Sequence, residues 1–526
     1  MKLVRYLPLL ALLLLCRAPV AAQDTELTPE QMLDRYLHFP DQREAVRPKL
    51  LALGADKLAE LIRGYPRPPA PEVGEHKFET ECPDGFKRPY WVTIPADYDA
   101  AKPAALLVCL HGGVMAAPVD SSVAIMRWYN KYIGARENPR PIVTLAASAD
   151  CYGTWMNAAW WRDAGRQNIL HFIRQAKLRL NIDPERVYIT GFSDGGSGTL
   201  SMAFNSPDVF AGYQPMCGDP VIPPTDGVMH AYTNLKGANI HAFNGAKDPI
   251  YPGKEVEKLY REANKQGASI DWFIHPTAGH DWGDPDEIFP VQLGFLDQWV
   301  RPAVPDSIDW TADRALTGRR CWISIDECGE LTKAQNKAKK PVALRTGYRI
   351  DLGIKAPATQ GPPAEDAIVG KVDKDSVAEK MGIKDGDQVV KCDGQDVKTF
   401  ADVRMLLSQK HGGDDISLTV ERAGEIHTYT GTIPKPVKLP VGRIQAKRAS
   451  TISVEVYDVK RFSVWVTRDM LSAKGELTIK LNKSKVFDGK VEADAGVILD
   501  EFTRTGDREP LYVARVQIDV AEALGK

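Results

Sequence analysis

Short apolar runs alternate with amphipathic stretches between residues 75 and 303. Five runs are nearly continuous in apolar residues: 106–110, 142–145, 187–190, 240–243 and 270–274. Such runs are typical of parallel strands in a sheet that helices cover on both faces. In the stretch 168–180 the apolar residues recur at the helix period: Ile169, Leu170, Ile173, Ala176 and Leu180. The alternation predicts a mostly parallel α/β sheet.

The pattern differs on either side of this region. Residues 27–65 repeat apolar positions at the helix period and end at the proline-rich run 66–71, which predicts a small helical cap or prodomain and a linker. Residues 308–325 and 441–526 alternate apolar and polar positions between Gly and Asp turns, as antiparallel strands do. Because each half is too small for a good core, we expect one β-sandwich-like module interrupted by a separate unit.

Composition and charge narrow the class of protein. The 526 residues fit three or four domains, and 44% hydrophobic with 26% charged residues is ordinary for a globular chain. Lysine and arginine (67) nearly balance aspartate and glutamate (69), and no basic run is interleaved with aromatics, so no nucleic-acid partner is expected. The cysteines and histidines show no zinc-finger spacing, and we predict no metal site.

The first residues indicate export. Lys2 and Arg5 precede the apolar run 7–15, which is followed by the small residues of 20–22. This order is typical of a signal peptide, 1–22, cut after Ala22. The run is short for a bilayer, although an uncleaved anchor is the alternative. We therefore expect a periplasmic or secreted protein with no transmembrane segment in the mature chain.

Cysteine number leaves the disulfide pattern open. Seven cysteines follow residue 22, so at least one is unpaired. Export permits disulfides without requiring them. Cys321 and Cys328 are close enough in sequence to pair across a tight turn, which is a hypothesis because sequence does not fix connectivity.

The motif Gly191-Phe192-Ser193-Asp194-Gly195 is the strongest chemical signal in the chain. It has the Gly-x-Ser-x-Gly spacing, directly follows the predicted strand 187–190 and precedes a helix-like stretch at 199–204. A sharp strand-to-helix turn needs small residues beside the serine and lifts its hydroxyl above the sheet. The helix N-terminus behind it favours developing negative charge. Ser193 is the predicted nucleophile; the alternative is a Gly-rich turn with an incidental serine.

A nucleophilic serine needs a base, and the base needs an orienting acid. Asp248 follows the predicted strand 240–243, and His280 follows the strand 270–274. Both lie where open α/β sheets place their sites, and the order serine, acid, histidine is that of sheets carrying this elbow. The competing residues are placed less well for this role: Asp219, Asp226, His230, His241, His275 and Asp281.

His111-Gly112-Gly113-Val114 follows the predicted strand 106–110 and predicts an oxyanion loop. One donor would be the N–H of Gly113 or Val114, and the other that of Asp194. The alternative is an ordinary pair of glycines after a strand. The aromatic residues Trp155, Trp160 and Trp161 lie between this loop and the elbow and are predicted to line a substrate cleft, although core packing is at least as good an interpretation.

Together these motifs resemble secreted α/β-hydrolase serine esterases of the polyhydroxybutyrate-depolymerase, feruloyl-esterase and acetylxylan-esterase-like group. The resemblance covers roughly residues 75–303 and implies ester hydrolysis through an acyl-enzyme, with no cofactor and no metal. The motifs also resemble the catalytic domain of prolyl-oligopeptidase-like peptidases. Those carry an N-terminal propeller, which the residues before Pro71 are too few to form.

The inserted unit resembles a PDZ domain of the bacterial HtrA type. The resemblance rests on Leu352-Gly353-Ile354, on Ile383 to Val390 with its Gly-Asp pair, and on the Asp393-Gly394 turn. It implies that backbone N–H groups of Leu352, Gly353 and Ile354 hold a peptide C-terminus. Pro357 and the prolines at 362–363 shorten the pairing edge, so a rigid spacer is the alternative.

The sequence thus predicts an α/β-hydrolase sheet with a PDZ domain and a C-terminal β-sandwich-like module. The predicted divisions are a signal peptide (1–22), a helical segment and linker (23–70), a hydrolase domain (71–303), a β module in two parts (304–346 and 437–526) and a PDZ domain (347–436). The predicted activity is hydrolysis of a small-molecule or polymer ester, such as an acyl group on polysaccharide. A serine peptidase and a non-catalytic binding scaffold are the alternatives.

Overall fold

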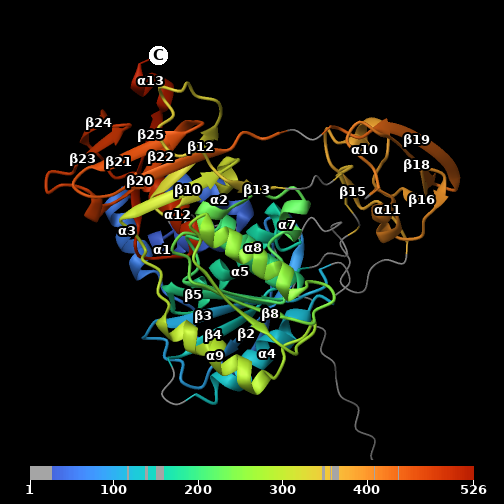
Figure 1. Cartoon of the computed structure of the whole chain (residues 1–526). Helices are drawn as coiled ribbons and strands as arrows, with labels where there is room; N and C mark the ends of the chain where they lie inside the picture. The colour runs from blue at the N-terminus through green and yellow to red at the C-terminus, as the bar shows by residue number, and fades with distance from the viewer. Residues whose placement is uncertain are drawn as a thin grey trace, which may run out of the picture.

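The computed structural model describes residues 27–114, 118–136, 140–149, 159–345, 350–355, 357, 366–407, 409–435 and 438–525. The predicted signal peptide and Trp155 lie outside these residues. The described part of the chain has no helix that is both long and apolar enough to span a membrane. It forms a central α/β body, a β-rich body beside it, and a third, smaller body drawn in orange (Figure 1).

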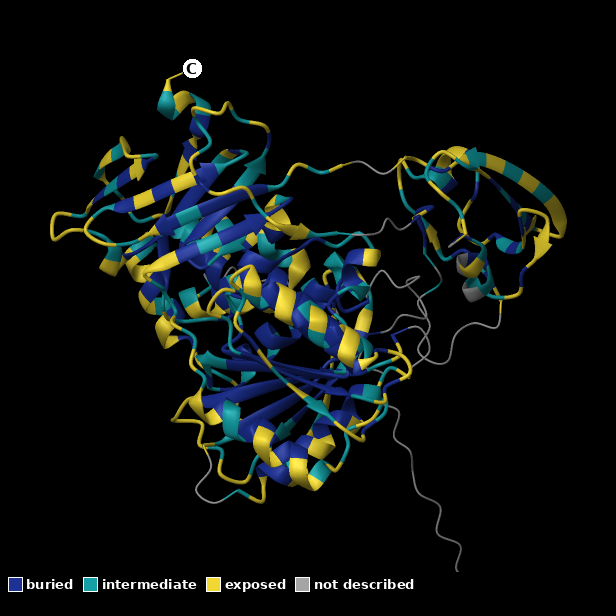
Figure 2. Ribbon diagram, viewed as in Figure 1, coloured by how far each residue is buried: buried dark blue, intermediate teal, exposed yellow. Residues whose placement is uncertain are grey.

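An eight-stranded sheet forms the centre of the molecule, in the order β1-β2-β4-β3-β5-β6-β8-β9. Its strands are β1 (Gly74–Glu81), β2 (Lys87–Ile94), β3 (Ala104–Leu110), β4 (Ile142–Ala146), β5 (Ile182–Phe192), β6 (Gly212–Met216), β8 (Ile240–Gly245) and β9 (Ile270–His275). The pairs from β4 to β9 are parallel, while β1 and β2 add an antiparallel edge. The predicted α/β sheet is confirmed, and its strands β3, β4 and β8 are wholly buried, whereas the edge strands β1 and β9 are largely accessible (Figure 2).

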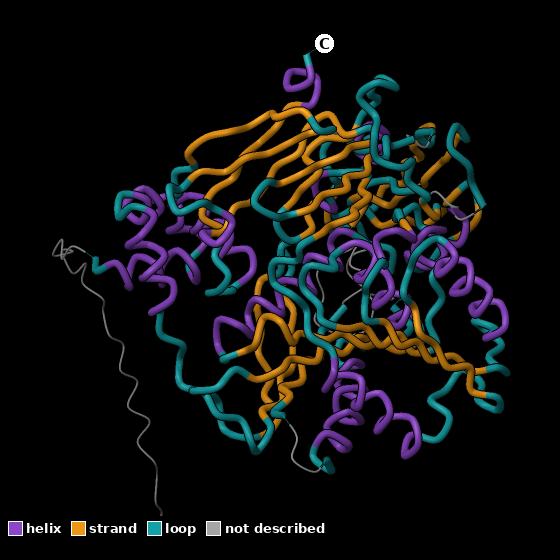
Figure 3. Tube along the Cα trace, turned by 60° about the vertical axis from the view of Figure 1, so that its left-hand side comes forward, coloured by secondary structure: helices purple, strands orange, loops and turns teal. Residues whose placement is uncertain are grey.

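Helices cover both faces of this sheet, as the continuous apolar strands require. One face packs against α5 (Asp163–Arg179), α6 (Asp194–Asn205) and α8 (Gly253–Lys265). The other packs against α4 (Ser121–Ile133) and α9 (Pro285–Gln298). Figure 3 shows the strands as an orange layer with purple helices on either side. Two short elements, α7 (Ile222–Thr225) and β7 (His230–Ala231), lie between β6 and β8 in the chain.

The N-terminal helices are α1 (Pro29–His38), α2 (Arg43–Leu51) and α3 (Ala55–Gly64). A capping box at Thr28 and Gln31 starts α1. The apolar faces of the three helices share one core with Leu178 of α5 and with Ile498, Leu499 and Phe502 of α12 (Ala495–Thr505). The segment therefore joins the central body to residues more than 400 positions later.

The β-rich body combines strands from before and after the inserted unit. One sheet has the order β10-β20-β21-β23-β24 and the other the order β11-β12-β22-β25. The earlier strands are β10 (Ser307–Ala312), β11 (Arg319–Arg320) and β12 (Ile323–Cys328); β13 (Ala343–Leu344) pairs with β7. The later ones are β20 (Gly442–Lys447), β21 (Ile452–Tyr457), β22 (Val459–Thr467), β23 (Glu476–Leu481), β24 (Ser484–Lys490) and β25 (Tyr512–Asp519), with α13 (Val520–Leu524) after them. The two sheets bury one shared core.

The inserted unit has a core of its own. Its elements are β14 (Ile354–Lys355), β15 (Lys371–Val372), α10 (Val377–Met381), β16 (Gln388–Cys392), β17 (Gln395–Asp396), α11 (Phe400–Leu407), β18 (Asp415–Arg422) and β19 (Glu425–Thr432). The Gly-Asp pair of the motif is structural: Asp387 is buried, and its carboxylate accepts hydrogen bonds from Arg422 Nε and Nη2 at 2.6 and 2.8 Å.

The hypothetical disulfide between Cys321 and Cys328 is wrong: both are free thiols. Cys321 is buried with a positive φ of 47° between β11 and β12. Cys328 ends β12, where its Sγ donates to Ala312 O at 3.3 Å. The strand separates the two side chains, so nearness in sequence does not bring them together.

Candidate active site

Ser193 occupies the strained turn that the motif predicts. It lies between β5 and α6 with φ 56° and ψ −117°, a region that side chains rarely adopt. The flanking glycines permit the turn: a Cβ on Gly191 would lie 2.3 Å from Gly195 O, and one on Gly195 would lie 2.3 Å from Leu110 O. The serine is half-buried, so its hydroxyl is within reach of a ligand.

The predicted base and acid meet Ser193 at this edge of the sheet. His280 Nε2 lies 2.9 Å from Ser193 Oγ, and its Nδ1 lies 2.7 Å from Asp248 Oδ2. Asp248 follows β8 and His280 follows β9, two strands whose carboxyl ends lie on the same side of the sheet as that of β5. With Nδ1–H donated to Asp248, Nε2 is left to accept the serine proton.

The acid is held rigidly. Asp248 is 3% exposed, and its second oxygen, Oδ1, accepts the backbone N–H groups of Ile250 and Tyr251, each at 2.8 Å. Competing histidines have other partners: His241 bonds Asp271 at 2.7 Å, and His275 Nδ1 accepts the Ala278 N–H at 3.0 Å. The described geometry therefore brings together one serine, one histidine and one aspartate.

The oxyanion loop lies directly above the elbow. A Cβ on Gly112 would be 2.8 Å from Ser193 Cβ, so the loop backbone touches the nucleophile. Val114 N–H donates to Asp194 Oδ2 at 3.0 Å, whereas no hydrogen bond of the Gly113 N–H occurs among the described residues. Of the two predicted loop donors, Gly113 is therefore the better candidate. The other predicted donor, the N–H of Asp194, lies in the first turn of α6, where helix N–H groups lack intrahelical acceptors.

The predicted substrate contacts of Trp160 and Trp161 need correction. Trp160 is 0% exposed, and its Nε1–H donates to His111 O at 2.8 Å, so it supports the oxyanion loop from behind. Trp161 is also buried and donates to Asp226 Oδ2 at 2.9 Å. Both indoles belong to the core, because tertiary packing covers them on all sides.

Two aromatic residues beside the histidine were not predicted as site residues. The Phe192 ring lies 5.1 Å from the His280 ring and 4.3 Å from that of Trp282, and both aromatic residues are half-buried. The only sequence signal is their position, one residue before Ser193 and two after His280. They offer an apolar surface next to the nucleophile.

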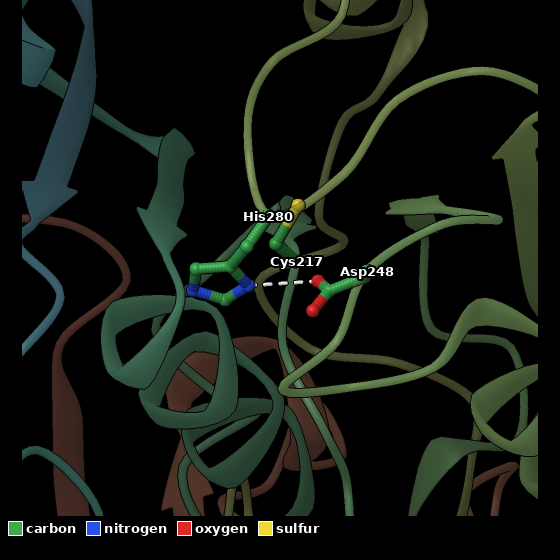
Figure 4. A group of neighbouring side chains, drawn as sticks. All are labelled: Cys217, Asp248 and His280. Atoms are coloured by element: carbon green, nitrogen blue, oxygen red, sulfur yellow. Dashed lines mark hydrogen bonds and ion pairs between the residues drawn. The ribbon is translucent and has the colours of Figure 1, made fainter.

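Cys217 is also close to the acid and the base (Figure 4). Potential metal-ligand atoms of Cys217, Asp248 and His280 lie within 4.8 Å of one another. Burial and the nearby charge of Asp248 raise the pKa of the Cys217 thiol to about 12, and its Sγ donates to Asp281 O at 3.3 Å. Both ring nitrogens of His280 already serve Asp248 and Ser193, so the arrangement suits proton transfer better than metal ligation.

The predicted carboxylate loop of the PDZ unit lies before β14. Gly353 has a φ of 75°, and its N–H donates to Asp351 Oδ1 at 2.8 Å. Leu352 and Ile354 are buried, and Leu352 O accepts the Ala378 N–H at 2.8 Å. One of the three N–H groups predicted to hold a peptide carboxylate is therefore already bonded.

Comparison with known proteins agrees with the α/β-hydrolase fold of the central body and with the PDZ fold of the inserted unit. The model of the dienelactone hydrolase family matches residues 146–292, and a PDZ domain model matches residues 368–422. Poly(3-hydroxyalkanoate) depolymerase C of Paucimonas lemoignei is 33% identical over 151 residues, which are 24% of this chain and 36% of that protein. A putative zinc metalloprotease of Bartonella henselae is 36% identical over 98 residues, which are 19% of this chain and 27% of that protein.

Among solved structures, a thermostable esterase is 20% identical, with a TM-score of 0.35, and the match covers 43% of this chain and 63% of that one. The chain spans 27% and 36% of the length of the two curated relatives. The predicted recognition is confirmed: an α/β-hydrolase domain similar to esterases is combined with a PDZ domain.

Proposed function

We propose that this protein is an exported serine hydrolase that cleaves carboxylic esters of a small molecule or a polymer, a class that includes acyl groups on polysaccharide, polyesters and lipid esters. The observation that carries the proposal is the hydrogen-bonded series Asp248–His280–Ser193 at the N-terminus of α6. The similarity to a poly(3-hydroxyalkanoate) depolymerase supports an ester substrate. Export rests on the predicted signal peptide, and N-terminal sequencing of the secreted chain tests the cut after Ala22.

The geometry suggests a two-step reaction. Ser193 Oγ attacks the ester carbonyl while His280 Nε2 takes its proton, and Asp248 stabilises the resulting imidazolium. The N–H groups of Gly113 and Asp194 hold the oxyanion. His280 then protonates the departing alcohol, and the acyl group stays on Ser193. Water, deprotonated by His280, attacks this acyl-enzyme and releases the acid.

The test is hydrolysis of p-nitrophenyl esters of graded acyl length, with aryl peptide amides alongside. Ser193→Ala is expected to abolish turnover without changing the thermal midpoint, because the hydroxyl is the nucleophile. Ser201→Ala is the matched control: its hydroxyl is buried in the same helix without a partner, so turnover is expected to be unchanged. Undiminished hydrolysis by Ser193→Ala would overturn the proposal.

The same assay separates the alternatives. Turnover of amides at an efficiency comparable with esters would favour a peptidase whose PDZ unit recruits peptide termini. A lack of turnover on both, together with no labelling of Ser193 by a fluorophosphonate, would favour a binding scaffold.

A further inference from the structure

A groove of about 860 Å³ lies between the β-rich body and the edge of the hydrolase sheet opposite the candidate active site. One wall is the polar face of the sheet β10-β20-β21-β23-β24, and the other contains residues that precede β6 and β8, such as Phe210 and Lys236. Ser193, Asp248 and His280 follow the carboxyl ends of their strands, and none of them lines the groove. The volume falls in the range of ligand sites, which is roughly 300 to 1,000 Å³.

A cross-strand row of alternating serine and lysine side chains runs along the sheet wall. The register pairs Ser307 of β10 with Lys447 of β20, Lys447 with Ser453 of β21, and Ser453 with Lys480 of β23. Residues paired across neighbouring strands share one face of a sheet, and all four of these are exposed and line the groove. Neighbouring strands lie about 4.8 Å apart, so the backbones of the two lysines are about 10 Å from each other.

The lysines of the groove have no counter-ion in the described part of the chain. The ammonium groups of Lys447 and Lys480, and those of Lys236 and Lys483 elsewhere in the lining, form no ion pair and no hydrogen bond with a described residue. All four side chains are exposed. By contrast, the lysines that line two other cavities each have a carboxylate partner, at 2.6 and 2.7 Å. The groove therefore offers accessible positive charges that no protein group neutralises.

The groove is positive in a chain whose charges nearly balance. Its lining has six basic and two acidic side chains, whereas the whole sequence has 67 basic and 69 acidic ones. Asp309 is neutralised by Arg443, which donates to its two oxygens at 2.7 Å each. Glu455 is thus the one lining carboxylate without a described partner. Because charges of one sign in a concave, low-dielectric surface focus their field, the groove favours an anionic ligand.

The side chains of the groove also discriminate among anionic ligands. The lining aromatic residues Phe210 and Tyr213 are only 3% and 2% exposed, so they offer no surface on which nucleic-acid bases could stack. A lipid surface is flat and does not enter a groove between two bodies. The hydroxyls of Ser307 and Ser453 have no hydrogen-bond partner among the described residues and alternate with the lysines. A polymer of uronic acid sugars has the complementary groups, since each sugar carries one carboxylate and several hydroxyls.

We propose that this groove binds an acidic polysaccharide whose carboxylates pair with Lys447 and Lys480 along the sheet wall and with Lys236 on the opposite wall. The hydroxyls of Ser307 and Ser453 bond the sugar hydroxyls between the charges. Several contacts act together, because a single exposed charge pair contributes little. The groove is separate from Ser193, Asp248 and His280, so the proposal stands independently of ester hydrolysis.

The test is fluorescence anisotropy of end-labelled oligomers titrated with the mature chain. The probes are an oligogalacturonate, a maltooligosaccharide of equal length as the uncharged control, and a single-stranded oligonucleotide of equal charge. Saturable binding of the oligogalacturonate is expected, and it should weaken as salt is raised because exposed charges are screened. The maltooligosaccharide should not bind. The oligonucleotide should bind at least about tenfold more weakly than the oligogalacturonate, because its bases find no stacking surface.

The double variant Lys447→Gln and Lys480→Gln is expected to weaken oligogalacturonate binding about tenfold, because two charged contacts are lost. Lys236→Gln, on the opposite wall, should weaken it several-fold. The matched control is Lys57→Gln with Lys254→Gln, the same charge change at exposed lysines of α3 and α8, and it should bind as the wild type does. All these side chains are exposed, so the variants are expected to fold. The proposal is overturned if the oligogalacturonate does not bind saturably, if either other probe binds as tightly, or if the double variant binds no more weakly than the control.

Discussion

Asp194 links three parts of the candidate active site through a single side chain. Its Oδ2 accepts the Val114 N–H at 3.0 Å, and its Oδ1 accepts the Tyr251 hydroxyl at 3.2 Å. Val114 belongs to the oxyanion loop, and the Tyr251 N–H bonds Asp248. The carboxylate thus connects the predicted oxyanion loop and the segment that holds Asp248 to the residue next to Ser193.

Asp194→Ala keeps the backbone N–H but releases the loop, so kcat is expected to fall about ten- to a hundredfold, less than the loss of a whole oxyanion donor. KM and the thermal midpoint should change little, because the carboxylate acts on positioning in the transition state. Steady-state kinetics on a p-nitrophenyl ester measures this, with Asp297→Ala, at a carboxylate on α9, as control. An unchanged kcat would show that the Asp194 carboxylate does not position the loop for the reaction.

At the residue scale, the sequence identified the hydrogen-bonded candidate residues better than their surroundings. Ser193, Asp248 and His280 could be singled out as candidates because each follows a strand and their order is constrained. The burial of Trp160 and the bond from the Val114 N–H depend on contacts between distant segments, which leave no local pattern. The partners of Phe192 and Trp282 were hidden for the same reason.

Among the elements, the turn from β5 to α6 has very close backbone contacts. Gly195 begins α6 against the carbonyl of Leu110, the last residue of β3, at a distance that excludes any Cβ. The elbow therefore depends on two neighbouring elements being nearly in contact, and not on the serine alone.

Gly195→Ala is expected to lower the free energy of unfolding by about 3 kcal/mol or more, because the new methyl would overlap the Leu110 oxygen. Gly294→Ala is the matched control: it lies in α9 with nothing within 4 Å of its Cβ position, so it should raise stability by up to about 1 kcal/mol. Urea unfolding of both variants measures the difference; equal effects would contradict the packing argument.

The sequence predicted elements where the apolar pattern was strong. The five predicted strands of the sheet are present as β3, β4, β5, β8 and β9. The strand β6 was missed because its sequence, Gly-Tyr-Gln-Pro-Met, mixes glycine, proline and a polar residue, yet it is fully buried. The helix α12 was missed because it lies within a stretch that otherwise alternates like strands.

Across the whole molecule, Glu501 joins segments from both sides of the PDZ unit. Its carboxylate accepts hydrogen bonds from Arg319 at 3.2 and 3.0 Å and from Arg504 at the same distances. Burial alone would raise the pKa of Glu501, but the charges of Arg319 and Arg504 outweigh it and lower this pKa to about 2. Its charge therefore stabilises the fold.

Glu501→Gln is expected to lower the free energy of unfolding by about 3 to 5 kcal/mol at pH 7, since two arginines lose their buried partner. Because the folded pKa lies below the ordinary value of 4.5, the contribution of Glu501 is complete above that pH and is lost as the pH falls towards 2. The gap to the wild type should narrow over this range in urea titrations. A gap that stays constant down to pH 3, or an equal loss in the exposed Glu44→Gln, would contradict the assignment.

At the scale of the whole molecule, family resemblance identified the hydrolase and the PDZ unit. It did not identify the packing of the N-terminal helices against α12. A helical pattern shows which face of a helix is apolar and gives no information about the surface that covers it. The prediction of a small cap therefore missed that this segment completes a core formed with the later module.

That shared core has a consequence for the order in which the protein can mature. Translation supplies the N-terminal residues first, and domains generally fold as units as they emerge. Here, however, the core of α1, α2 and α3 is completed by residues of α12, and β10 pairs with β20. Both α12 and β20 are synthesised only after the entire PDZ unit. The hydrolase sheet and the PDZ unit can fold on the nascent chain, because the buried residues of their cores come from their own segments, whereas the N-terminal helices and the β-rich body stay incomplete until the later strands and α12 are available. The apolar faces of the N-terminal helices and of β10 thus stay exposed for most of synthesis, and exposed apolar surface of this kind favours aggregation.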